Sequence, residues 1–124
     1  YTEGKFCTFT LRDEIMMDRL IEGHSADWKR LDVAILHAGV LERLLGIDAR
    51  ALEEQRNITY TRDPDGAIEA VDSGKEQVFF LLNPTNPQEV IRVADHGEKM
   101  PQKSTDFYPK LLTGLVITKL AIGR

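Results

Sequence analysis

The chain alternates apolar and polar positions most regularly over residues 5–12, where aromatic and β-branched side chains are also enriched. This pattern predicts a β-strand. Residues 58–61 form a second β-type run. Residues 78–82 are apolar without alternation, which is typical of a strand covered on both faces. Residues 113–120 predict a last strand.

Apolar residues at helical spacing predict several helices. The longest is expected over residues 28–45, where apolar side chains cover most of the circumference, so we expect it to be buried. Gly46 ends it, and Ser25 or Asp27 would cap its first turn. Residues 13–23 fit a brief helix better than an ordered loop. Further short helices are predicted over residues 48–55, over residues 65–72 and after Pro87.

The same pattern occurs twice after a predicted strand: an Asp or Asn, a proline, a short predicted helix and a glycine. It begins at Asp63-Pro64 and at Asn86-Pro87. Asp63 is placed as an N-cap and Pro64 as the first helical residue. Strand, helix and strand joined by short links favour a parallel pair with a right-handed crossover. The sequence therefore predicts one domain over residues 1–124. Its expected fold class is α/β to α+β, with a mixed, partly parallel sheet of about four or more strands flanked by one long buried helix and several short helices.

The distribution of charge narrows the classes of ligand. The net charge is -4, made of -7 over residues 1–95 and +3 over residues 96–124. An acidic body argues against nucleic acid or an anionic membrane as a partner, whereas a small basic segment suits a small anion. No apolar run is long enough to span a membrane. Cys7 is the only cysteine, which favours a reducing, cytoplasmic setting and excludes an internal disulfide or a cysteine zinc site within one chain.

The segment over residues 100–110 combines cations, hydroxyls and aromatics between two prolines, without helical or strand periodicity. Such groups are suited to phosphate binding on a loop. The glycines of a P-loop are absent, so that motif is excluded. The alternative is a solvated connection that its aromatic residues pin to the core. The candidate ligand-binding residues of this loop are Lys103, Ser104, Thr105, Tyr108 and Lys110.

Polar residues that follow two predicted strands are further candidates, namely Asp63, Asn83 and Thr85. Ligands collect at the carboxyl ends of parallel strands, and helix N-termini favour anions there. These residues are equally well explained as caps and turn formers. His37 lies in the apolar arc of the long helix, either as a core or interface histidine or as a ligand-contacting group. The histidines lack metal-ligand spacing, so no metal site is expected.

Four strings in order along the chain, residues 31–37, 58–64, 80–85 and 100–111, resemble the carboxy-terminal part of the prokaryotic domain-of-unknown-function family 1015. The resemblance implies that the chain is a carboxy-terminal fragment of a longer protein. Some members of the family are labelled as similar to ParB chromosome-partitioning proteins. ParB-like folds include free-serine kinases, so the resemblance also implies a small-molecule kinase.

Two functions follow as hypotheses. In the first, the domain helps to bind a phosphate-bearing metabolite or nucleotide, within a small-molecule phosphotransferase in which a nucleotide would be the cofactor. In the second, it is a noncatalytic scaffold that docks on the N-terminal region of the same longer chain or on a second subunit, as in a homodimer. The sequence leaves the catalytic residues, the reaction and the substrate open.

Overall fold

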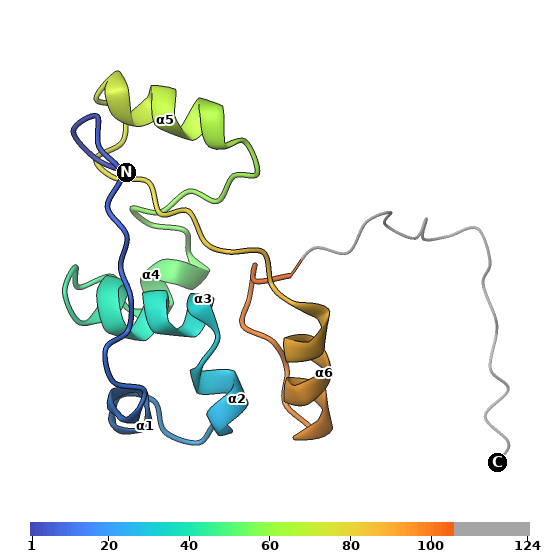
Figure 1. Ribbon diagram of the computed structural model, residues 1–124. Helices are drawn as coiled ribbons and strands as arrows, with labels where there is room; N and C mark the ends of the chain where they lie inside the picture. Colours follow the sequence, from blue (N-terminus) through green and yellow to red (C-terminus); the bar gives the residue numbers. More distant parts are fainter. Residues whose placement is uncertain (106–124) are drawn as a thin grey trace, which may run out of the picture.

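The protein is described by a computed structural model, in which residues 1–105 are described and form short helices joined by extended segments (Figure 1). In chain order the elements are α1 (Ile15–Leu20), α2 (Ala26–Lys29), α3 (Asp32–Ala34), the π-helix η1 (Ile35–Glu42), α4 (Ala49–Glu53), α5 (Pro64–Asp72) and α6 (Pro87–Asp95). Within residues 1–105 the only β-pairing is one isolated antiparallel bridge between Thr2 and Lys5.

The predicted α/β to α+β fold is wrong for the described residues, because the three strand-like segments that fall there do not pair into a sheet. Within residues 1–105, backbone hydrogen bonding between distant segments is limited to Tyr1 and Phe79. The Tyr1 amino group donates to the Phe79 carbonyl at 2.6 Å, and the Phe79 N–H donates to the Tyr1 carbonyl at 2.9 Å. Residues that favour strands form a strand only where a neighbouring segment supplies hydrogen-bond partners for their backbone. The fourth predicted strand, residues 113–120, lies outside the described residues.

The predicted helix starts at Asp63 and Asn86 are confirmed. The Asp63 carboxylate accepts a hydrogen bond from the Gly66 N–H at 3.1 Å, and Pro64 is the first helical residue of α5. Asn86 and Glu89 form a capping box at the start of α6. These caps satisfy N–H groups that would otherwise lack a partner in the first helical turn. Local side-chain chemistry therefore fixes where both helices begin.

The single long buried helix predicted over residues 28–45 is not observed. Leu31 adopts an extended conformation (φ -61°, ψ 133°), which separates α2 from α3, and α3 continues into the π-helix η1. The predicted cap is found at Ser25, whose hydroxyl accepts from the Trp28 N–H at 3.2 Å. Burial is also partial, since Leu44 is 72% exposed. The apolar circumference of the segment thus reflects short helices with different buried faces.

The buried core gathers Leu31, Val33 and Ala34 with Val93 from α6. Ile21, Trp28 and Met100 pack against this cluster from the side. Helix α1 packs on α2 and η1, and α2 packs on α6. The core therefore joins α6 to elements that precede it by about 60 residues in the chain. Helix α5 lies apart from this group in Figure 1.

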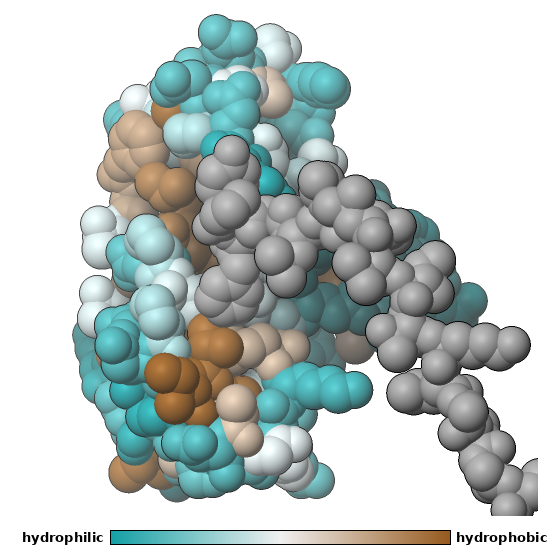
Figure 2. Space-filling view, turned by 90° about the vertical axis from the view of Figure 1, so that its right-hand side faces the viewer, coloured by the Kyte–Doolittle hydropathy of each residue, from teal (hydrophilic) through white to brown (hydrophobic). Residues whose placement is uncertain are grey.

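Large apolar side chains also remain on the surface. Figure 2 shows brown, apolar patches that interrupt the polar surface on the face that it draws. Several of the exposed large apolar side chains belong to the extended segments, including Phe6, Phe9, Val78, Leu81 and Leu82. Exposed apolar groups of this number and size are typical of surfaces that bind a ligand or another protein.

Candidate functional site

A cavity of about 480 Å³ lies among η1, α5 and the extended segments over residues 57–62 and 75–82. Its volume falls within the range of roughly 300–1,000 Å³ that is usual for small-molecule sites. Its walls are mainly apolar. Among the lining residues are Val33, Leu36, Leu41, Val71, Phe79 and Phe80.

Charged side chains in the lining are mainly basic. Arg62, Lys75 and Lys103 line the cavity, whereas Glu76 is the one acidic residue among the described lining residues. The chain as a whole has the opposite balance, with 16 basic and 20 acidic residues. The cavity is therefore a local basic site on an acidic protein, a setting that favours an anionic ligand.

Lys103 reaches the cavity from a turn that backbone and hydroxyl hydrogen bonds hold together. Its backbone is left-handed (φ 59°), a conformation that costs a residue with a side chain more than it costs glycine. The Ser104 hydroxyl donates to the Pro101 carbonyl at 2.6 Å, and the Thr85 hydroxyl donates to the Ser104 carbonyl at 2.8 Å. Thr85 and Ser104 thus hold the turn on which Lys103 is placed.

His37 lines the cavity from η1. Burial lowers the pKa of its imidazole below the ordinary 6.5. A neutral imidazole offers one donor and one acceptor rather than a positive charge. His37 can therefore orient a ligand by a hydrogen bond, while positive charge for an anion would come from Lys75 and Lys103.

Tyr60 is a further polar lining residue, and burial raises the pKa of its phenol. The phenol thus stays protonated at neutral pH and keeps an O–H group that can donate. Tyr60, Lys75 and Arg62 were not among the site residues expected from the sequence. Their only signal was their place in or beside the predicted strands. Tyr60 lies within the β-type run over residues 58–61, Arg62 directly follows that run, and Lys75 precedes the run over residues 78–82.

The other predicted site residues that fall within residues 1–105 do not line this cavity. The Asp63 carboxylate caps α5, and the Asn83 side-chain amide donates to Asp32 at 2.8 Å. Asp63 and Asn86 cap α5 and α6, so their side chains accept hydrogen bonds from the N–H groups that were expected to attract an anion. Thr85, Ser104 and Thr105 are half-buried beside the turn that carries Lys103. Tyr108 and Lys110 lie outside the described residues.

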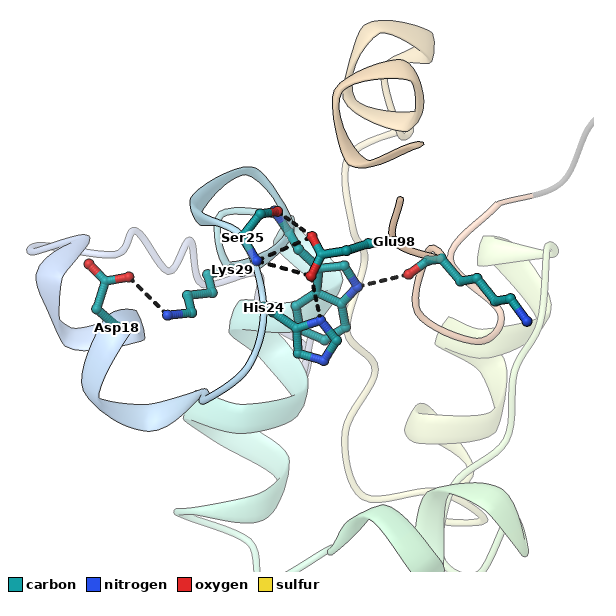
Figure 3. A network of polar contacts seen from close by, with 7 residues as sticks. Asp18, His24, Ser25, Lys29 and Glu98 are labelled. Carbon is teal, nitrogen blue, oxygen red and sulfur yellow. Dashed lines mark hydrogen bonds and ion pairs between the residues drawn. The ribbon is translucent and has the colours of Figure 1, made fainter. Parts of the chain in front are cut away.

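A second polar cluster joins the start of α2 to the chain after α6 (Figure 3). The Glu98 carboxylate accepts from the Ser25 hydroxyl and from the Ser25 N–H, at 3.0 Å for the latter, and lies 3.0 Å from His24 Nδ1. The hydrogen bond from the Ser25 hydroxyl is the main cause that lowers the pKa of Glu98, helped by the Ser25 N–H and by His24. The His24 ring stacks on Trp28 with centroids 3.9 Å apart.

This cluster serves packing rather than catalysis. The Ser25 hydroxyl and the His24 imidazole both face the carboxylate, so the histidine is not placed to take a proton from the serine. The Trp28 indole N–H also donates to the Lys99 carbonyl, at 2.9 Å. Together these bonds fasten α2 to the chain that follows α6, close to the buried core.

Neither metal ligation nor a membrane span is found in the described part of the chain. No group of three or more His, Cys, Asp or Glu side chains within residues 1–105 is arranged to hold a metal ion. No helix there has the length and apolar character needed to cross a bilayer.

No protein-family model, curated protein or solved structure matches this chain. The resemblance to domain-of-unknown-function family 1015 therefore stays a prediction.

Proposed function

We propose that the cavity among η1, α5 and residues 75–82 binds a phosphate-bearing metabolite or nucleotide. One observation carries the proposal: three basic side chains and one acidic side chain line an apolar cavity in a chain whose net charge is negative. An apolar wall accommodates a ring or an aliphatic portion, and a basic rim accommodates a phosphate.

Each lining group has a distinct part in this proposal. Lys75 supplies positive charge from the chain after α5, and Lys103 supplies it from the turn after α6. His37, neutral because burial lowers its pKa, supplies one hydrogen bond, and the Tyr60 hydroxyl supplies another. Thr85 and Ser104 act as positioning residues through the turn at Lys103.

The resemblance to family 1015 extends the proposal to a small-molecule phosphotransferase, to which this domain contributes ligand binding. The reacting groups of such an enzyme are not assigned to residues of this chain. A cytoplasmic setting, expected from the single cysteine, fits a phosphorylated metabolite as the ligand.

Calorimetric titration of the chain with inorganic phosphate, pyrophosphate and AMP tests the proposal. We expect binding of at least one probe, and we expect Lys103→Ala to raise its Kd about 5- to 30-fold, because a charged hydrogen bond to phosphate contributes about 1–2 kcal/mol at a partly solvated site. The matched control is Lys99→Ala, since Lys99 is exposed nearby and does not line the cavity.

Two outcomes contradict the proposal. Absence of heat with all three probes removes the phosphate site. Equal losses of affinity in the Lys103 and Lys99 variants would mean that the probes respond to general surface charge, and so would remove the cavity as the place of binding.

A further inference from the structure

The extended segment over residues 5–12 exposes its apolar side chains. Phe6 is 65% exposed and Phe9 is 81% exposed, and Cys7 and Thr8 are also on the surface. Figure 1 shows this segment as an open run from the amino-terminal turn down to α1. The Tyr1 ring lies against Phe6, with centroids 4.8 Å apart. Aromatic residues exposed on extended backbone favour contact with another polypeptide.

Beyond Lys5, the backbone of the same segment has no hydrogen-bond partner among residues 1–105. Lys5 exchanges two hydrogen bonds with Thr2, but the N–H and C=O groups of residues 6–12 make no hydrogen bond to any other described residue. A row of unpaired backbone groups beside alternating side chains is the template on which an added strand pairs. The segment thus has both components of strand addition, the backbone partners and the side-chain alternation.

The charges at its ends discriminate between possible occupants. Lys5 and Arg12 stand at the two ends, and neither forms an ion pair with another described residue. In a symmetric antiparallel pair of two copies, Lys5 of one copy would face Arg12 of the other at both ends. Like charges directly opposite each other destabilise a strand pair, whereas opposite charges stabilise it. A partner strand with acidic ends is therefore favoured over a second copy.

We propose that residues 5–12 bind an extended segment of another polypeptide by β-strand addition, and that this segment is alternately apolar with an acidic residue at each end. The surface is separate from the ligand cavity, because none of these residues lines it. This interaction gives the scaffold hypothesis from the sequence a defined surface and a defined chemistry of partner.

Peptides of the same length as the segment test the proposal, with fluorescence anisotropy of the labelled peptide as the measurement. The first peptide alternates valine and threonine between two terminal glutamates. The second replaces both glutamates with lysines, and the third keeps the glutamates but carries N-methyl groups on alternate backbone amides. We expect the first peptide to bind about fivefold more tightly than the second, from two weak cross-strand charge pairs. We expect the N-methylated peptide not to bind, since it lacks the donors for pairing.

Variants of the protein then test whether the peptide binds at residues 5–12. We expect the double variant Lys5→Glu, Arg12→Glu to prefer the lysine-ended peptide, and we expect Phe9→Asp to abolish binding. Leu44→Asp is the matched control, because Leu44 is 72% exposed and does not line the ligand cavity. Circular dichroism checks that the helices are retained. Equal binding of the three peptides, lack of binding by the first, or unchanged preference in the double variant would overturn the proposal. A concentration-dependent dimer that Phe9→Asp abolishes would also overturn it, in favour of a second copy.

Discussion

Two hydroxyl groups of a kind that often binds anions, those of Thr85 and Ser104, donate to backbone carbonyls in this protein. Thr85 and Ser104 were expected to donate to a ligand, and they donate to the carbonyls of Ser104 and Pro101. The sequence could predict that this segment is polar and carries Lys103. It could not predict where the Thr85 O–H points, because that depends on a contact between residues 19 positions apart.

His37 makes the stability of the fold depend on pH in a predictable direction. Burial lowers its pKa below 6.5, so the unfolded chain takes up a proton at a higher pH than the folded protein does. The stability that neutral His37 contributes is present above about pH 6.5 and is lost as the pH falls through its lower folded pKa.

We therefore expect His37→Gln to show a smaller drop in urea midpoint between about pH 7 and about pH 5 than the natural chain shows. Equilibrium unfolding by urea, followed by circular dichroism, measures this drop. Identical pH dependence in the two proteins would place the titration on other groups.

Helices and strands differ in how far the sequence predicts them. The caps at Asp63 and Asn86 act within three residues of the helix they begin, so the local sequence contains all that is needed. The β-type runs over residues 5–12, 58–61 and 78–82 require partner segments, and no described segment pairs with them as a ladder. The break at Leu31 was missed because Leu31 and the residues before it, Lys29 and Arg30, are good helix formers.

Helix α6 allows a matched test of its packing. Val93 is 1% exposed in the core, and Ile91 is 57% exposed on the same helix. We expect Val93→Ala to lower the free energy of unfolding by about 2 kcal/mol, from lost burial and a small cavity. Ile91→Ala should change it by less than about 0.5 kcal/mol.

Urea denaturation of both variants measures the difference. Similar losses in the two variants would mean that α6 does not pack through the Val93 face.

At the scale of the molecule, a few contacts between distant segments join the described chain. Glu98 bonds to Ser25 across 73 positions, and Tyr1 pairs with Phe79 across 78 positions. Periodicity reveals neither contact, because both depend on single polar groups rather than on a repeated pattern. The candidate cavity was missed for the same reason, since its basic residues come from three separate segments.

Glu98 makes the attachment between α2 and the chain after α6 sensitive to acid. Its pKa is lowered from the ordinary 4.5, mainly by the Ser25 hydroxyl. The stabilisation by the ionised carboxylate is complete above about pH 4.5 and is lost as the pH falls through the lower folded pKa.

We expect Glu98→Gln to have a lower melting temperature than the natural chain at neutral pH, and we expect the difference to shrink as the pH falls below about 4. Differential scanning fluorimetry across pH measures it. Glu22→Gln is the control, because Glu22 is exposed and forms no ion pair with a described residue. A difference that stays constant to low pH would show that ionisation of Glu98 does not stabilise the attachment.

The π-helical winding of η1 makes this part of the chain tolerant of a change in length. A π-helix closes its hydrogen bonds over one residue more than an α-helix does, so loss of one residue would let η1 wind as an α-helix. His37 and Leu41 both line the cavity from η1, and a homologue one residue shorter between them would place them three positions apart. Positions three apart on an α-helix lie on one face, so both side chains would still face the cavity. Loss of one residue here would therefore change the winding of the helix and keep this wall of the cavity.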